Sequence, residues 1–366
     1  MLRIAVAGAG LIGRRHLAAI QAYAGTEVCA IADPAPAAAE LADELAVPGY
    51  AAVADLLADQ RPDGVILATP NLRHHADGLA VLRAGIPVLV EKPLATTVAE
   101  AAELVALAQA GGVPLLTGHH RNHSAIMRTA REVIASGRLG RLVAVQGSAC
   151  FRKPDDYFEV GGGWRRRSGG GPIQLNLIHE VDNLHQLLGP VVEVQAMTSA
   201  AARGFEVEDT AGILLRFANG ALGSFLLSDV AASARSWEQT SGENPDYDHH
   251  DDEDAYVVMG TDGSLAIPTM RLKSFADRAS WTEPLIGERV PVPAVDPIDA
   301  QLAHFAAVIR GDQQPVCDGA AGLAAVATID AILTAARTGG TVTVPTPGNE
   351  RNPHAHGKLD PAPASR

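Results

Sequence analysis

The chain has 366 residues, a length that indicates two domains or one large domain. Hydrophobic residues make up 47% of it and charged residues 19%, values that fit a folded soluble protein and exclude a disordered chain. The formal net charge of −13 argues against binding to nucleic acid or to an anionic membrane, because both require clustered positive charge.

In the first 120 residues, short β-rich runs alternate with alanine-rich helical stretches. This alternation predicts an α/β domain over residues 1–120, with a parallel sheet joined by right-handed crossovers. The expected strands lie near residues 2–7, 28–32, 64–69, 87–91 and 114–118. The expected helices lie near residues 11–23, 35–45, 72–84 and 97–110.

After residue 120 the pattern changes to longer β runs. A predicted helix over 122–136 precedes predicted strands, which lie at 141–150, 191–197, 211–218 and 221–228. The dipeptide Asn219-Gly220 between the last two strands is a strong signal for a tight hairpin. Antiparallel pairing of this kind predicts a separate α+β domain over residues 121–344 with a large, mainly antiparallel sheet.

Two helices are predicted near the end of this second domain. The first, over 297–310, carries an apolar stripe, with Asp296 placed to cap its start and Gly311 to end it. The second covers residues 319–338. The last segment, 345–366, mixes Pro, Gly, Asn and His without periodicity, so we expect it to be disordered.

Three cysteines, Cys29, Cys150 and Cys317, lie far apart and lack C-x-x-C spacing. They support neither a disulfide framework nor a zinc site, and they suit a reducing compartment.

We find no run of about 18 apolar residues to span a bilayer. The start, Met1-Leu2-Arg3-Ile4, also lacks the features of a signal peptide. We therefore expect a cytoplasmic protein that does not interact with membranes.

A glycine-rich turn connects the first predicted strand to the first predicted helix. Its sequence, Gly8-Ala9-Gly10-Leu11-Ile12-Gly13, has the spacing G-x-G-x-x-G. Such glycines allow a tight turn, close approach of the backbone to a pyrophosphate, and close packing of helix against strand. The start of the following helix offers unpaired N–H groups to the phosphates. The alternative is an ordinary glycine-rich turn, because this motif alone is weak evidence.

One acidic residue supports a dinucleotide site. Asp33 ends the second predicted strand, 20 residues after the last glycine of the motif, where a carboxylate accepts hydrogen bonds from the adenosine ribose. A carboxylate also repels the 2′-phosphate of NADP, and Pro34 and Ala35 supply no arginine to bind it. We therefore expect NAD rather than NADP as the cofactor, although Arg14 and Arg15 could reach the same place.

Two further strand ends carry polar residues. Thr69-Pro70-Asn71 follows the third predicted strand, with His74 three residues later, and Glu91-Lys92-Pro93 follows the fourth. Ligands of an open parallel sheet lie beyond the carboxyl ends of its strands. Lys92 lies between Glu91 and Pro93 at this rim. A functional role for Lys92 is therefore favoured over the alternative, a solvated charge on the surface.

A lysine in this position suits the chemistry of a dehydrogenase. Hydride transfer from a secondary alcohol to nicotinamide requires removal of the hydroxyl proton. A lysine beside an oxidised, positively charged nicotinamide should have a lowered pKa, so Lys92 could hold or relay that proton near neutrality. In the reverse direction, a protonated lysine polarises the carbonyl group.

These motifs, in this order and spacing, resemble the Gfo/Idh/MocA oxidoreductase family over nearly the whole chain. The further matching residues are His16, Gly118-His119-His120-Arg121, and Gly169-Gly170-Gly171 leading to His179 and Asp182. The resemblance implies an N-terminal Rossmann domain that binds NAD(P). It also implies a C-terminal domain whose open sheet builds the substrate site and commonly mediates homo-oligomerisation. Most members oxidise or reduce a hydroxyl–carbonyl pair on a sugar, polyol or related compound.

The resemblance implies roles for individual residues. Lys92 and His179 match the family's acid–base residues, and Glu91 would contact the nicotinamide ribose. Besides Glu91 and Lys92, the residues expected at the cofactor are Gly8, Gly10, Leu11, Ile12, Gly13, Asp33, Thr69, Pro70, Asn71 and His74. A lone histidine on an amphipathic stretch is more often structural, but the glycine run before His179 permits close approach of a ligand, which favours catalysis.

The sequence departs from the family four residues before His179. Many sugar dehydrogenases of the family have an aspartate there, one helical turn away, whereas this chain has Leu175. Asn176 and Asp182 could share the helix face of His179, and Asn176 could hydrogen-bond the substrate in place of the aspartate. A neutral amide cannot raise the basicity of His179 as a carboxylate would, so the substrate's identity stays open.

Loops between the domains supply the remaining substrate candidates. Segments 153–158 and 164–167 flank a glycine run, and Arg165 next to Trp164 would suit a carboxylate or a hydroxyl-rich substrate. A surface loop with solvated arginines is the alternative. His120 and Arg121 follow the last strand of the first domain and should face the cleft. The predicted substrate contacts are Lys92, His120, Arg121, Trp164, Arg165, Asn176 and His179.

The acidic segment 247–254 has the composition of a metal site but lacks spaced ligand geometry, so we expect a solvated loop and no metal.

The leading hypothesis is an NAD-dependent oxidoreductase acting on a secondary alcohol or ketone of a sugar, cyclitol or sugar acid. One alternative is an enzyme that retains NAD and oxidises a sugar carbon transiently to enable elimination or hydrolysis. Another is an NAD-binding regulator without redox activity.

Overall fold

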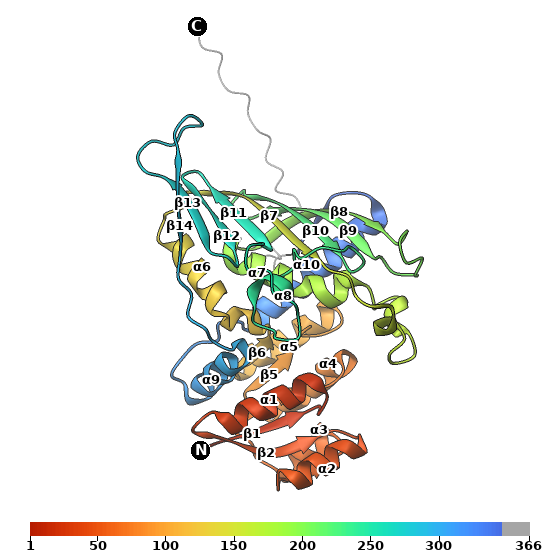
Figure 1. Cartoon of the computed structure of the whole chain (residues 1–366). Helices are drawn as coiled ribbons and strands as arrows, with labels where there is room; N and C mark the ends of the chain where they lie inside the picture. The colour runs from red at the N-terminus through yellow and green to blue at the C-terminus, as the bar shows by residue number, and fades with distance from the viewer. Residues whose placement is uncertain (346–366) are drawn as a thin grey trace.

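The computed structural model describes residues 1–345, which form two stacked parts (Figure 1). One part contains a six-stranded sheet and the other a nine-stranded sheet. The tail predicted to be disordered, 345–366, lies outside the described residues except for Pro345.

The first sheet is parallel throughout, in the order β3-β2-β1-β4-β5-β6. Its central strands are runs of small and branched apolar residues, buried on both faces because helices cover both sides. The strands are β1 (Leu2–Ala7), β2 (Thr26–Ala32), β3 (Gly49–Tyr50), β4 (Gly64–Leu67), β5 (Val88–Glu91) and β6 (Leu115–Gly118). The helices are α1 (Leu11–Ala22), α2 (Pro36–Glu44), α3 (Val53–Asp59), α4 (Asn71–Arg83) and α5 (Val98–Gly111).

This architecture confirms the α/β Rossmann domain with a parallel sheet. Two of its elements, β3 and α3, are absent from the predicted set. With two and seven residues, they are too short to produce a clear hydrophobic period in the sequence.

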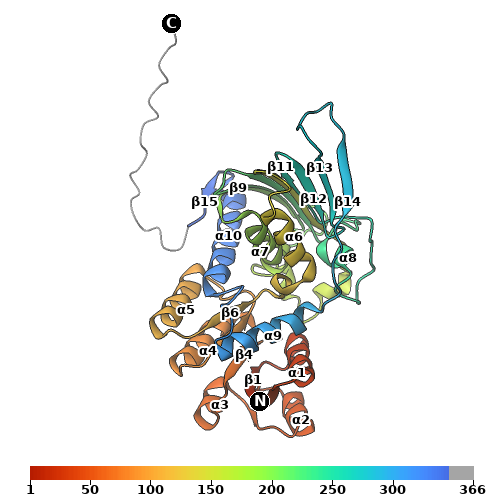
Figure 2. The ribbon, with the colours of Figure 1, turned by 90° about the vertical axis from the view of Figure 1, so that its left-hand side faces the viewer.

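A helix from far along the chain completes the first domain. α9 (Pro297–Arg310) has the predicted bounds, and the Asp296 side chain accepts hydrogen bonds from its first N–H groups. Gly311 ends it with a φ of +80°. Phe305 packs in one core cluster with Ile20 of α1, and Figure 2 shows α9 lying beside α1. By packing, α9 therefore belongs with the first domain.

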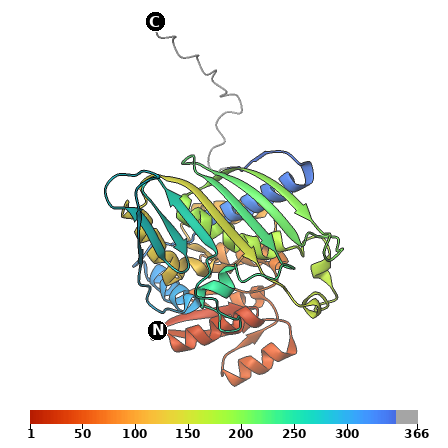
Figure 3. The ribbon, with the colours of Figure 1, turned by 45° about the horizontal axis from the view of Figure 1, so that its top comes forward.

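The second sheet has the order β14-β13-β12-β11-β7-β10-β9-β8-β15 and is antiparallel except between β7 and β10. Figure 3 shows its strands side by side across the top of the molecule. The first five strands are β7 (Leu142–Cys150), β8 (Val191–Ser199), β9 (Thr210–Phe217), β10 (Leu222–Ser228) and β11 (Tyr256–Gly260). The others are β12 (Gly263–Ile267), β13 (Arg271–Phe275), β14 (Leu285–Arg289) and β15 (Val342–Thr343).

The α+β domain with a large, mainly antiparallel open sheet is thus confirmed. The hairpin at Asn219-Gly220 is confirmed as well, because Leu222 of β10 pairs with Arg216 of β9. Strands β11 to β14 are absent from the predicted set. Each has only five residues, and turns or charged residues follow closely.

One face of this sheet packs on α6 (Ala125–Ala135), α7 (Ile178–Leu188) and α10 (Gly319–Thr338), as Figure 2 shows. By length and composition, α10 is apolar enough to cross a membrane, which corrects the expectation that no such run exists. However, 61% of its apolar window is buried, and it packs against β8, α5 and α7. In this structure α10 is a core helix that contacts both domains.

The helix predicted over 122–136 begins later. A 3₁₀ turn, His120–His123, comes first, and Ser124 then caps α6 by accepting hydrogen bonds from the N–H groups of Ile126 and Met127. The turn brings His120 and Arg121 to the boundary between the two domains.

Candidate active site

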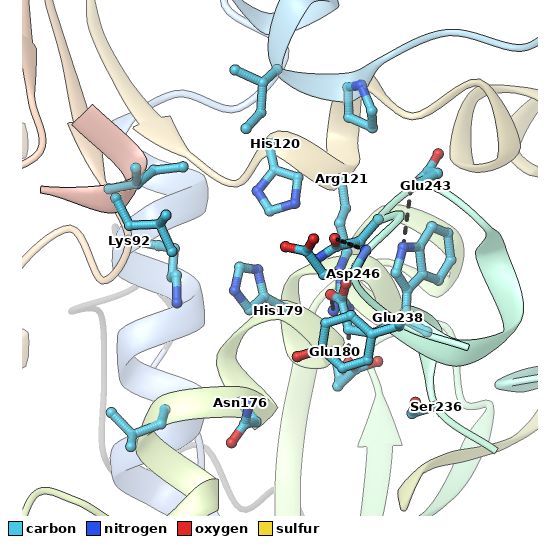
Figure 4. A pocket seen from close by; sticks show the side chains of 18 of the residues that line it. Lys92, His120, Arg121, Asn176, His179, Glu180, Ser236, Glu238, Glu243 and Asp246 are labelled. Atoms are coloured by element: carbon cyan, nitrogen blue, oxygen red, sulfur yellow. Dashed lines mark hydrogen bonds and ion pairs between the residues drawn. The ribbon is translucent and has the colours of Figure 1, made fainter. Parts of the chain in front are cut away.

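A cavity of about 850 Å³ lies between the carboxyl ends of the parallel strands and the second domain. Its wall is built from the glycine-rich loop, the ends of β5 and β6, the segment before α7 and the loop around α8 (Trp237–Ser241). Figure 4 shows Lys92, His120 and His179 reaching into it from different elements. An open α/β sheet binds its ligands at this edge.

The glycine-rich loop has the shape that a dinucleotide needs. Gly8 has a φ of +91°, and a Cβ there would lie 2.2 Å from the carbonyl oxygen of Ala68. A Cβ on Gly13 would lie 1.9 Å from the carbonyl oxygen of Gly8. A Cβ on Gly10 would meet no described atom within 4 Å, so Gly10 keeps space open at the start of α1, where no described side chain caps the helix. These features fit a pyrophosphate bound by backbone N–H groups.

Asp33 lies beside this loop at the end of β2. Its Oδ2 accepts a 2.7 Å hydrogen bond from the N–H of Ala9, and its Oδ1 accepts one of 2.8 Å from the N–H of Ala35. The carboxylate is therefore held at the loop, in the position that fits an adenosine ribose. Arg15, the alternative ligand for an NADP phosphate, forms a 2.8 Å ion pair with Asp296.

The residues after β4 divide into two groups. Asn71 lines the cavity, and Pro70 precedes α4 beside it. His74 is fully buried instead, with Nδ1 2.7 Å from the carbonyl oxygen of Pro93 and Nε2 2.8 Å from that of Thr69. The geometry thus makes His74 a link between the turns that follow β4 and β5, rather than a lining residue of the cavity.

Glu91 is buried behind the cavity at the end of β5. Its Oε1 lies 2.8 Å from Nε2 of His16, and its Oε2 accepts a 3.2 Å hydrogen bond from the N–H of Lys92. Burial opposes the charge of this carboxyl, but His16 and nearby cations outweigh burial and lower the pKa of Glu91. With both oxygens engaged by the protein, Glu91 fixes the strand end from which Lys92 projects.

Lys92 extends from this strand end into the cavity (Figure 4). Burial lowers the pKa of Lys92, although the neighbouring Glu91 carboxylate opposes the shift. A lysine with a lowered pKa has a larger share of neutral amine near pH 7, and only the neutral amine can accept a proton.

Two histidines share the cavity with Lys92. The ring of His179, in α7, lies 5.5 Å from the ring of His120, measured between centroids. Burial lowers the pKa of His179 well below its ordinary value, and the charges of Lys92 and Arg121 lower it further. Burial also lowers the pKa of His120 to about 4. Both imidazoles are therefore neutral at pH 7.

The segment before His179 is a π-helical turn, Ile173–Leu177, that continues into α7. Such a turn contains an extra residue and changes which side chains share a face. Leu175 and Asn176 are both partly buried and line the cavity. Position 175 therefore faces the site rather than the core.

Asp182, three residues after His179 in α7, is buried at 1% exposure and is not among the residues that line the cavity. Its Oδ2 accepts a 2.6 Å hydrogen bond from Asn122 and lies 4.0 Å from Nδ1 of His119. Burial raises the pKa of Asp182 to about 7, and the hydrogen bond from Asn122 opposes that shift.

Arg121 lines the cavity but is already paired. Its Nη1 lies 2.7 Å from Oε1 of Glu180 and its Nη2 lies 2.7 Å from Oε1 of Glu238. The guanidinium also lies 5.3 Å from the ring centroid of Trp237. Because both terminal nitrogens hold carboxylates of the protein, Arg121 organises the cavity wall instead of offering a vacant clamp for a charged substrate.

Trp164 and Arg165 reach the cavity from the short 3₁₀ turn Trp164–Arg166. The guanidinium carbon of Arg165 lies 4.4 Å from the ring centroid of Tyr157 and 4.9 Å from that of Trp164. These contacts join the two loop segments that the sequence analysis assigns to the crevice.

One wall of the cavity is absent from the sequence analysis. α8 and the loop after it bring the carboxylates of Glu238, Glu243 and Asp246 to the side opposite Lys92 (Figure 4). Burial opposes the charge of Glu238, but Arg121 outweighs it and lowers the pKa of Glu238. α8 has five residues, so no periodic pattern in the sequence could identify this wall.

The acidic segment 247–254 is mostly exposed. Among residues 1–345, no group of three or more His, Cys, Asp or Glu side chains is placed to hold a metal ion.

The fold and this cavity define a class of protein, the two-domain oxidoreductases with an NAD-binding Rossmann fold. Residues 2–119 match the family model described as "Oxidoreductase family, NAD-binding Rossmann fold", and residues 127–266 match the GFO/IDH/MocA C-terminal domain. The 1,5-anhydro-D-fructose reductase of Ensifer adhaerens is 30% identical over 93% of this chain and 97% of that protein. The chain belongs to the GFO/IDH/MocA family and is a dehydrogenase or reductase.

Two other relatives cover almost the same length. The D-xylose 1-dehydrogenase (NADP+) 2 of Haloferax volcanii is 29% identical over 91% of this chain and 97% of that protein. The WlbA dehydrogenase of Bordetella pertussis, solved with NADH and UDP-GlcNAcA, is 26% identical with a TM-score of 0.75, and covers 94% of this chain and 99% of that chain. Oxidoreductases named for sugar substrates are thus among the relatives of this chain.

Proposed function

We propose that the protein transfers a hydride between the nicotinamide of NAD and a secondary hydroxyl or ketone of a sugar-like or cyclitol-like substrate. The observation that carries the proposal is the convergence of Lys92 and His179, from two domains, on one cavity beside the glycine-rich loop. The reductase of 1,5-anhydro-D-fructose and the dehydrogenase of D-xylose among its relatives support a substrate of this class.

The residues of the cavity fit the proton transfer that this reaction needs. NAD, held by the glycine-rich loop and Asp33, supplies the hydride acceptor or donor. During oxidation, Lys92 as a neutral amine takes the proton from the substrate hydroxyl, and during reduction its ammonium form returns a proton to the carbonyl oxygen. The neutral imidazole of His179 hydrogen-bonds the same oxygen and keeps it beside Lys92.

The charges around the cavity favour a substrate rich in hydroxyl groups. Glu238 and Asp246 are hydrogen-bond acceptors on the wall opposite Lys92, where sugar hydroxyls can donate to them. Arg121 is neutralised by Glu180 and Glu238, so it does not add a binding site for an anion.

Asp33 favours NAD over NADP by repelling the 2′-phosphate. We also place this activity in the cytoplasm.

An absorbance assay tests the proposal. The purified protein is mixed with NAD or NADP and a panel of sugars, inositols and sugar acids, and with NADH and 1,5-anhydro-D-fructose. At least one neutral polyhydroxy compound should change the NADH absorbance, and the Lys92→Met variant should abolish the change. Lack of turnover with every neutral compound, together with turnover of a sugar acid, would contradict the proposed substrate class. NAD that copurifies tightly, with product formed at constant absorbance, would favour the NAD-retaining alternative.

A further inference from the structure

A second lysine lies close to the cavity and is absent from the proposed chemistry. Lys153 follows β7 and is only 7% exposed. Its Nζ donates a 2.7 Å hydrogen bond to Oδ1 of Asn176 and lies 3.6 Å from Oδ2 of Asp229. The rings of Tyr157 and Phe151 lie beside the ammonium group, with centroids at 4.9 and 5.7 Å. Because a buried ammonium group requires such partners, Lys153 is confined to this position.

The anion that pairs with Lys153 is itself fixed. Arg203 donates a 3.2 Å hydrogen bond from Nε to Oδ1 of Asp229. Its Nη2 also donates to the backbone carbonyl oxygens of Lys153, at 2.9 Å, and of Asp229, at 2.7 Å. The ends of β7 and β10 are thereby held together. Asp229 is fixed, and the Lys153 ammonium group that pairs with it stays beside Asn176.

This arrangement fixes the direction of one cavity-lining amide. A lysine ammonium group is only a donor, so the atom of Asn176 that faces it must be the amide oxygen. The amide NH₂ group is then left to the cavity wall that Asn176 lines (Figure 4). The preceding residue, Leu175, offers no polar group, so this part of the wall presents hydrogen-bond donors from Asn176.

We propose that Lys153 is a positioning residue that fixes the Asn176 amide as a donor, and that this amide binds a substrate oxygen that can only accept hydrogen bonds. Ring ether, glycosidic and carbonyl oxygens belong to this class. The substrate's hydroxyl groups then lie toward the acceptors Glu238 and Asp246 on the other wall. This inference rests on the proposed function, because it concerns the orientation of the substrate in the same cavity.

Kinetics of four variants test the coupling. Lys153→Met and Asn176→Ala should each raise KM by about tenfold and leave kcat within about twofold, because a hydrogen bond that orients the substrate acts equally in ground and transition states. The double variant should be no worse than Asn176→Ala, since Lys153 acts only through Asn176. Lys273→Met, which removes an exposed lysine from β13, should change neither constant. Additive losses, or a fall in kcat at constant KM, would overturn the proposal.

The conservative variant Asn176→Asp tests the donor itself. A carboxylate still accepts a hydrogen bond from Lys153, so the fold and the melting temperature should be kept, but it cannot donate to the substrate. KM should rise by about tenfold or more. An unchanged KM in this variant would show that the substrate does not use the Asn176 NH₂ group.

A measurement without substrate separates this inference from the proposed function. Burial lowers the pKa of Lys153 to about 8, opposed by Asp229. The side-chain NH₂ signal of Asn176 in the ¹⁵N-asparagine-labelled protein, assigned by its loss in Asn176→Ala, should therefore titrate near pH 8. Lys153→Met should abolish this titration. A signal that does not titrate would refute the role of Lys153, whereas titration without turnover of any sugar would refute the proposed function alone.

Discussion

Lys92, His120 and His179 share a shift of pKa in one direction, toward the uncharged form. The cause is common to all three, because each lies in a cavity between domains where burial penalises charge. Arg121 in the same cavity keeps its charge, since two carboxylates lie within hydrogen-bond distance. The residue type alone therefore does not decide which side chains can exchange a proton at pH 7.

Replacing Lys92 should remove proton transfer and spare cofactor binding. Lys92→Ala should lower turnover by a factor of about 100 or more, the usual scale for a positioned acid–base group. NAD affinity should stay within a few-fold, because the groups expected to hold the pyrophosphate and the adenosine ribose, the glycine-rich loop and Asp33, follow other strands, β1 and β2. Initial rates and calorimetric titration measure the two effects, with Lys273→Ala as the exposed control. A Lys92 variant that keeps half of the activity would move the proton transfer to another group.

The rates of oxidation and of reduction should depend on pH in opposite ways. Oxidation requires the neutral amine of Lys92, so its rate should rise with pH through the Lys92 pKa, which burial lowers below the ordinary value of 10.5. Reduction requires the ammonium form, so its rate should fall over the same range. Rate profiles recorded in both directions provide the test. Two profiles that rise together would show that another group titrates.

The preference for NAD should depend on Asp33. NAD should bind at least about tenfold tighter than NADP, equivalent to about 1.4 kcal/mol, because the carboxylate repels the extra phosphate. Asp33→Asn removes the charge, keeps an acceptor oxygen for only one of the N–H groups of Ala9 and Ala35, and should narrow the ratio of the two affinities. Calorimetric titration of both cofactors decides the matter, and equal affinities in the unmodified protein would remove this role from Asp33.

Among the elements, the π-helical turn Ile173–Leu177 has the most direct effect on the site. It directs Leu175 and Asn176 to the cavity, whereas Ile173 and Leu177 pack in the core of the second domain. A regular helix over these positions would rotate the segment relative to α7. The single replacement of the family aspartate by Leu175 therefore changes the lining of the cavity without disturbing the core.

Restoring the family residue tests this placement. Because Leu175 faces the cavity, Leu175→Asp should cost about 1 kcal/mol or less in the free energy of unfolding, rather than the several kcal/mol of a carboxylate buried alone. The new carboxylate should favour the protonated form of His179, raise its pKa and shift the acidic limb of the pH–rate profile upward. Denaturant unfolding and rate profiles measure the two effects. A strongly destabilised variant with an unmoved limb would show that position 175 belongs to the core.

At the scale of the whole molecule, the two domains are held together by segments that cross between them. α9 returns to the first domain, and α10 packs against helices of both. The cavity is therefore assembled from strand ends of one sheet and from helices and loops beneath the other. The chemistry of the cavity therefore depends on how the two domains are placed relative to each other, and neither domain alone forms the site.

The second sheet also has an outer face with exposed apolar side chains on neighbouring strands. They are Met197, Leu214, Leu222 and Leu226. Apolar groups clustered in this way are typical of an interface, so we predict that copies of the chain associate through this face. Light scattering should give a multiple of 38.0 kDa for the unmodified protein and 38.0 kDa for a Leu214→Lys/Leu226→Lys variant. Val316→Lys, an exposed apolar residue elsewhere, should keep the oligomer, and a monomeric unmodified protein would contradict the prediction.

Much of the fold is predictable because its signals are local. The sequence by itself determines the β–glycine loop–α start, the alternation of the first domain, the Asn219-Gly220 hairpin, and the capped helix α9, each from residues within about one turn or strand of one another. The strand end also identifies Lys92 as a candidate, and the resemblance to the family identifies His179, with support from the glycine run before it.

Tertiary structure alone decided what surrounds those candidates. The partners of Arg121 lie 59 and 117 residues away, and Lys153 meets Asn176 across 23 residues. The acidic wall comes from a five-residue helix without a periodic pattern, and the burial that shifts the pKa values exists only once both domains enclose the cavity. The physical reason is that hydrogen bonds and desolvation depend on distance in space, which separation along the chain does not reveal.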